Sequence, residues 1–166
     1  MKTIITAFVM LFAASTANAT VLEELYSEED RPDEYCLALN IYYEARGSNR
    51  ADRLAVADVV MNRVYDTRYP NTVCDVVKQG RQDANGNMIR HQCQFSWYCD
   101  GKADRPQDQD RWIDAQQLAY MVFVLNEYRG LTEGATHYHA TYVDPEWARD
   151  LALVGRIGAH IFYRWE

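Results

Sequence analysis

The sequence predicts an α+β fold that is mostly helical, with a small β-sheet in the second half of the chain. Apolar residues recur with a helical period over residues 34–46, 50–64 and 107–129, and the period changes to two over residues 135–142. The 166 residues, 48% of them hydrophobic and 25% charged, have the length and composition of about one globular domain. This composition excludes a collagenous or disordered chain.

The first predicted helix, residues 34–46, carries a carboxylate on its apolar face. Leu37, Ile41 and Glu44 are spaced at i, i+4 and i+7 and therefore share one stripe. Burial raises the pKa of a carboxyl group, which can then hold a proton near neutral pH and donate it to a leaving oxygen. Glu44 is therefore the main catalytic candidate, and the alternative is a structural ion pair with Arg46 or another arginine.

Two more helices begin at recognisable caps. Asn49 is placed to cap a buried helix over residues 50–64, and Thr72 to cap a short helix that ends near Gly80.

The middle of the chain combines a polar stretch with a long helix. Residues 81–106 are rich in turns, and the aromatic stretch 93–99 within them is expected to be extended. A helix over residues 107–129 follows. Five of its side chains are expected to face the core: Trp112, Ala115, Ala119, Val122 and Phe123.

The C-terminal part is predicted to form the sheet. Residues 135–142 read as a strand, residues 145–149 as a brief helix, and residues 153–165 as a closing strand or hairpin.

Alternation along the strand at residues 135–142 places His137 and His139 on one face and Tyr138 and Tyr142 on the other. We expect the two histidines to line a cleft, where they would contact substrate or ligate a metal. The alternative is a half-exposed structural pair.

The N-terminal residues 1–19 have the form of a signal peptide. Lys2 precedes an apolar run, and Ala17-Asn18-Ala19 supplies a small-x-small cleavage site. The run is shorter than the roughly 20 residues that a bilayer span requires. We therefore expect export to the periplasm or beyond, with no stable membrane association after cleavage; the alternative is a retained anchor.

An acidic N-terminal segment at residues 20–34 follows this leader. The formal net charge of −7 argues against a nucleic-acid partner, which requires a basic face.

The four cysteines Cys36, Cys74, Cys93 and Cys99 suggest two disulfides in an exported protein. Three pairings are possible. Cys93 and Cys99 can close a small loop, and Cys36 and Cys74 would then tie the first helix to the third. A four-cysteine zinc site is the alternative, although no C-x2-C pair is present.

Several sequence strings together resemble the SleB-like cell wall hydrolases, the spore cortex-lytic enzyme family. They occur in the family's order from about Cys36 to Tyr163, and they are ALNIYYEARG (38–47), AVADVVMNRV (55–64), PNTVC (70–74), CQFSW (93–97), ATHYHA (135–140) and IGAHIFY (157–163).

This resemblance implies a lysozyme-like, lytic transglycosylase-like catalytic domain at residues 35–166 that cuts the glycan strands of peptidoglycan. The glutamate of the family's E-A-R-G motif is its general acid and corresponds to Glu44. Two departures stand out. The chain has no room for the separate peptidoglycan-binding domain of the spore enzymes, and its four cysteines favour a Gram-negative or phage setting over a spore.

The expected reaction is cleavage of the β-1,4 bond between N-acetylmuramic acid and N-acetylglucosamine by a monomer without metal or other cofactor. Ordinary glycosidases use two carboxylates. Asp52 and Asp58 lie on the next helix, where Asp58 can approach Glu44, but a single prominent glutamate favours a lytic transglycosylase over a muramidase. The expected substrate-binding residues are Gln94, Phe95, Ser96, His137, Tyr138, His139 and Tyr142.

Two rival functions stay open at this point. One is a zinc-dependent amidase or endopeptidase that uses His137, His139 and Glu44, and the other is a glycan-binding module without catalysis.

Overall fold

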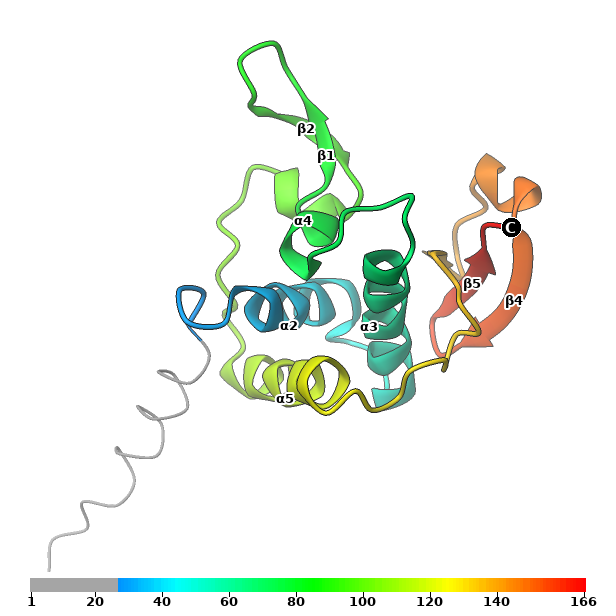
Figure 1. Cartoon of the computed structure of the whole chain (residues 1–166), viewed down its shortest axis with the longest axis horizontal. Helices are drawn as coiled ribbons and strands as arrows, with labels where there is room; N and C mark the ends of the chain where they lie inside the picture. Colours follow the sequence, from blue (N-terminus) through cyan, green and yellow to red (C-terminus); the bar gives the residue numbers. More distant parts are fainter. Residues whose placement is uncertain (1–26) are drawn as a thin grey trace, which may run out of the picture.

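The computed structural model describes residues 27–166, so the predicted signal peptide and the first part of the acidic segment lie outside the described residues. Helix α2 (Pro32–Ala45) packs against α3 (Arg50–Tyr65), α4 (Val73–Val77) and α5 (Gln109–Ala119), as Figure 1 shows. No helix within residues 27–166 is long and apolar enough to cross a membrane.

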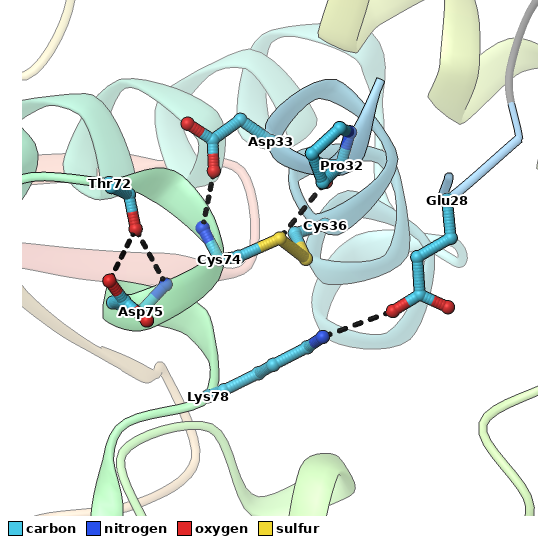
Figure 2. The surroundings of a disulfide bond; sticks show 8 residues. All are labelled: Glu28, Pro32, Asp33, Cys36, Thr72, Cys74, Asp75 and Lys78. Atoms are coloured by element: carbon cyan, nitrogen blue, oxygen red, sulfur yellow. Dashed lines mark hydrogen bonds and ion pairs between the residues drawn. A yellow bond between two sulfur atoms is a disulfide. The ribbon is translucent and has the colours of Figure 1, made fainter. Parts of the chain in front are cut away.

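The predicted caps and the first disulfide are confirmed. Asn49 Oδ1 accepts a hydrogen bond from the backbone N–H of Asp52 at 2.9 Å, and Thr72 caps α4 in the same way. A disulfide between Cys36 and Cys74 joins α2 to α4 (Figure 2). Beside it the Asp33 carboxylate accepts a hydrogen bond from the Cys74 backbone N–H at 2.9 Å, so the start of α4 is fixed to the start of α2 twice.

The turn-rich stretch contains an antiparallel hairpin of β1 (Gly80–Gln82) and β2 (Met88–Cys93), which projects from the helices in Figure 1. The expectation of an extended stretch at residues 93–99 is wrong, because η1 (Ser96–Cys99) is a 3-10 helix. The Cys93–Cys99 disulfide holds the two Cα atoms 6.0 Å apart. An extended chain would separate them by about 20 Å.

Helix α5 ends earlier than the sequence predicts. It passes into a π-helical turn, η2 (Tyr120–Val124), and left-handed residues at Asn126 and Tyr128 follow. The wider turn changes which side chains face inward. Val122 is buried as expected, whereas Phe123 is 37% exposed, so its expected place in the core is wrong.

The predicted small sheet is confirmed and has three antiparallel strands. Its order is β3 (His137–Ala140), β5 (His160–Arg164) and β4 (Ala152–Ile157), and the brief helix η3 (Glu146–Asp150) precedes β4. Ala135 and Phe162 pack against Ala55 and Val59 of α3. Helix α3 therefore lies between α2 and the sheet (Figure 1).

Candidate active site

Glu44 lies in the last turn of α2 at the edge of the core. Leu37 and Ile41, the other members of its stripe, are completely buried, and Glu44 itself is half-buried. It opens onto a pocket of about 140 Å³. The pocket is lined by residues from α2, α3, β3 and the segment that enters η1, namely Glu44, Arg63, Gln94, Phe95, Ser96 and Tyr138.

The Tyr138 hydroxyl donates a hydrogen bond to Glu44 Oε2 at 3.2 Å. Burial and the nearby negative charge of Glu44 raise the pKa of Tyr138 well above its ordinary value, so the phenol keeps its proton. Tyr138 is therefore a permanent donor to Glu44 Oε2.

The environment of Glu44 raises the pKa of its carboxyl group. Burial is the dominant cause, and the hydrogen bond from Tyr138 and the electrostatic effects of the nearby His160 and Arg63 side chains oppose it. A carboxyl group with a raised pKa that faces a pocket can serve as a general acid.

Arg63 supplies a fixed positive charge in the wall of the pocket. Its side chain is 4% exposed, and its Nε donates to the backbone oxygen of Thr136 at 2.7 Å. Its guanidinium lies 5.3 Å from the centroids of both the Tyr69 and the Phe95 ring. Arg63 thus contacts the residue just before β3 and the residue just before η1.

Sequence reasoning missed Arg63, although a signal for it is present. Val56, Val60 and Arg63 are spaced at i, i+4 and i+7, the same spacing as Leu37, Ile41 and Glu44. The first two members of each stripe are completely buried, and the third is the charged residue at the pocket. A charge on the apolar stripe therefore marks the site on both helices.

The second disulfide, Cys93–Cys99, closes the loop that carries Gln94, Phe95 and Ser96 into the pocket. This pairing was expected, and both predicted disulfides are present. Trp97 of the same loop stacks on Tyr43 and donates from Nε1 to Asn40 Oδ1 at 3.2 Å. The loop is therefore fixed to α2 next to Glu44.

The structure does not bring His137, His139 and Tyr142 to Glu44. The His137 ring lies against Trp147, and His139 stacks on Tyr163 and is hydrogen-bonded to its hydroxyl at 3.0 Å. Both histidines therefore lie on the face of β3 opposite Tyr138. Tyr142 follows the end of β3 and is 88% exposed.

The geometry offers no support for a zinc site made from His137, His139 and Glu44, since the strand separates the histidines from the glutamate. Burial, together with the charges of Arg63 and Arg68, lowers the pKa of His137 to about 4, so this ring is neutral at neutral pH. Within residues 27–166, no three His, Cys, Asp or Glu side chains cluster in a way that could hold a metal ion.

The sequence matches the family model described as Cell Wall Hydrolase over residues 47–163. The chain belongs to the cell wall hydrolase family. Glu44 lies just before the matched range. No curated protein matches the chain.

Two solved structures are similar to about four fifths of the chain. The chain is similar to the catalytic domain of the germination-specific lytic transglycosylase SleB from Bacillus anthracis, with 25% identity, a TM-score of 0.59, and coverage of 81% of this chain and 96% of that one. The chain is also similar to the catalytic domain of the Bacillus cereus SleB protein, with 25% identity, a TM-score of 0.56, and coverage of 80% of this chain and 91% of that one. The predicted lysozyme-like, mostly helical fold is confirmed.

Proposed function

We propose that this cell wall hydrolase cleaves the β-1,4 bond between N-acetylmuramic acid and N-acetylglucosamine as a lytic transglycosylase, with Glu44 as both general acid and general base. The observation that carries the proposal is the half-buried Glu44 carboxyl group, which has a raised pKa, faces a pocket and accepts a hydrogen bond from Tyr138. The likeness to a lytic transglycosylase catalytic domain supports it.

In the first step, Glu44 gives its proton to the glycosidic oxygen as the bond from that oxygen to C1 of N-acetylmuramic acid breaks. The sugar becomes oxocarbenium-like, and Glu44 is left as a carboxylate. The Tyr138 hydroxyl stabilises this carboxylate through its hydrogen bond to Oε2.

In the second step, the 6-hydroxyl of the same N-acetylmuramic acid attacks C1. Its proton passes to the Glu44 carboxylate, so the acid is restored and the product ends in a 1,6-anhydro sugar. This route requires one carboxylate, whereas an ordinary glycosidase uses two.

The partners of the neighbouring acids favour this route over a muramidase. Asp58, which from the sequence could approach Glu44, is bound to Arg129 and to the backbone N–H groups of Gly130 and Thr132. Asp52 is bound to His160. Among the described residues, Glu44 is the one acid that lines the pocket.

The other pocket residues suit a sugar substrate. Gln94 and Ser96 are exposed polar side chains in the pocket wall, and we assign to them the N-acetyl and hydroxyl groups of the glycan. Phe95 and Tyr138 add aromatic surface to the same wall.

We also propose the domain plan expected from the sequence, with a signal peptide at residues 1–19, an acidic segment at 20–34 and a catalytic domain at 35–166. The two disulfides are consistent with export to the periplasm or beyond.

The test is mass spectrometry of purified peptidoglycan after digestion. The proposal predicts fragments with 1,6-anhydro ends, which are lighter by one water molecule than the reducing ends that a muramidase produces. Reducing ends would overturn the transglycosylase step. Freed stem peptides, or activity lost in a chelator, would instead support a zinc amidase. Binding without any products would leave a glycan-binding module.

A further inference from the structure

We propose that Asp52 and His160 are positioning residues that hold the Tyr138 ring so that its hydroxyl reaches Glu44. The inference rests on the proposed role of Glu44. Neither residue lines the pocket, so both would act through Tyr138.

Asp52 fixes the turn between β4 and β5 to the start of α3. It is completely buried, and its Oδ2 accepts from the backbone N–H of Ala159 at 3.1 Å. Gly158, at φ +58°, lies so close that an added Cβ would be 2.6 Å from the Asp52 Cβ. The turn therefore has almost no freedom to shift along α3.

The same carboxylate orients His160. The His160 Nδ1 and the Asp52 Oδ1 are 2.8 Å apart. Burial by itself would raise the pKa of Asp52. The hydrogen bonds from His160 and from the Ala159 backbone outweigh burial and lower that pKa. Because Asp52 is then ionised, His160 Nδ1 is the donor, and the orientation of the imidazole is fixed.

His160 in turn supports Tyr138. The two rings meet edge to face, with centroids 5.1 Å apart and planes at 75°. Phe162 pairs with Tyr138 in the strand register, and the centroids of their two rings are 5.7 Å apart. With these two rings beside it, Tyr138 has its hydroxyl 3.2 Å from Glu44 Oε2, and a rotation of the ring would break that bond.

Asp58 is a matched control on the same helix. Like Asp52 it is completely buried on α3 and holds a distant backbone segment, here through Thr132 and Gly130. Its partners belong to the loop after η2 and do not include Tyr138 or Glu44. The two aspartates therefore separate positioning of the site from stabilisation of the fold.

The experiment compares His160→Gln, Asp52→Asn, Tyr138→Phe, the His160→Gln/Tyr138→Phe double variant and Asp58→Asn. Small displacements at a catalytic group cost up to about 10²-fold in rate, so we expect His160→Gln and Asp52→Asn to lower kcat about 10-fold with KM nearly unchanged. The double variant should be no slower than Tyr138→Phe, because His160 acts through the Tyr138 hydroxyl. Asp58→Asn should lower Tm but keep the kcat of the folded protein.

The pH profile supplies a second readout. The charged or titratable groups that face Glu44 are Arg63 from α3, Tyr138 from β3 and His160 from β5. The Tyr138 hydrogen bond lowers the pKa of Glu44, so its loss raises that pKa. The alkaline limb of kcat should therefore move to higher pH in Tyr138→Phe and in Asp52→Asn, and stay in place in Asp58→Asn. His160 also lowers the pKa of Glu44 directly, so Asp52→Asn, which keeps His160, separates the positioning role from that direct effect.

A parental kcat in both His160→Gln and Asp52→Asn, or fully additive losses in the double variant, would overturn the positioning role. If His160→Gln does not fold, the kcat of Asp52→Asn tests the positioning role. Asparagine keeps a side-chain oxygen that can accept the hydrogen bond from the Ala159 backbone, so this variant should fold. The proposed function fails separately. If Glu44→Gln is inactive while the Asp52 and His160 variants are unchanged, only the positioning role is lost, whereas an active Glu44→Gln overturns the function itself.

Discussion

The helical part and the sheet contribute to the pocket in different ways. Helices α2 and α3 supply the two charged residues, Glu44 and Arg63, and each continues a stripe of completely buried apolar side chains. The sheet supplies Tyr138 from one face of β3, while the histidines on either side of it point to the other face. The periodicity of a helix therefore indicates which charged residue lies on its buried face. A strand alternates between two faces, and the element that packs on it determines which face points toward the pocket.

The two parts are also held together differently. The helices share a continuous apolar core and the Cys36–Cys74 disulfide. The sheet packs Ala135 and Phe162 on α3 in a smaller apolar cluster and adds polar contacts to that helix, through Asp52 at one end and Arg63 at the other. We therefore expect that replacing the polar residues that join the sheet to α3 will change activity. Replacing apolar residues in the helical core should change mainly the stability of the fold.

The largest effect is expected for Glu44→Gln, which tests the helical contribution. Glutamine keeps the shape of the side chain but cannot donate an acidic proton, and general acid catalysis is typically worth about 10²–10⁴-fold. The variant should fold, bind peptidoglycan and lose nearly all turnover in a soluble-fragment assay. In the parent, activity should fall on the alkaline side as Glu44 loses its proton. Turnover of Glu44→Gln within a few-fold of the parent would contradict the mechanism.

The two disulfides offer the next comparison. Cys36–Cys74 closes a 38-residue separation and Cys93–Cys99 one of 6, for which chain entropy gives about 4 and about 2 kcal/mol. Cys36→Ser/Cys74→Ser should therefore lower the free energy of unfolding more in a urea titration. Cys93→Ser/Cys99→Ser should lower kcat more, because its loop carries three pocket residues. A parental kcat in Cys93→Ser/Cys99→Ser would show that the small loop keeps its shape without the disulfide.

Tyr138→Phe tests what the sheet contributes. Removal of the hydroxyl takes away the hydrogen bond to Glu44 Oε2, and we expect about a 10-fold lower kcat, the cost of roughly 1.4 kcal/mol in the barrier. Since that bond lowers the pKa of Glu44, the alkaline limb of the pH profile should move upward. An unchanged profile would mean that the hydroxyl does not act on Glu44.

The smallest effect is expected on the other face of the same strand. His137→Ala and His139→Ala remove rings that contact Trp147 and Tyr163 rather than the pocket. Their kcat values should stay within a few-fold of the parent, with a modest loss in Tm by calorimetry. A loss as large as that of Tyr138→Phe would place substrate on the histidine face and break the contrast between the two faces.

Local sequence signals were sufficient for much of the fold. The caps at Asn49 and Thr72 and the apolar stripe of α2 depend on residues within a few positions of one another, and the structure contains all of them. The change of period to two located the sheet for the same reason. Five predicted site residues also meet in one pocket, namely Glu44, Gln94, Phe95, Ser96 and Tyr138.

Only the tertiary structure decided which side of β3 faces the glutamate, how η1 turns, and where α5 ends. Alternation tells which residues share a face of a strand, but α3 determines which face is covered and which hydroxyl reaches α2. The role of Arg63 and the contact between Asp52 and His160 join residues far apart in the chain. The sequence therefore determined most of the local elements and the candidate acid Glu44, and the packing of the sheet on α3 determined the surroundings of that residue.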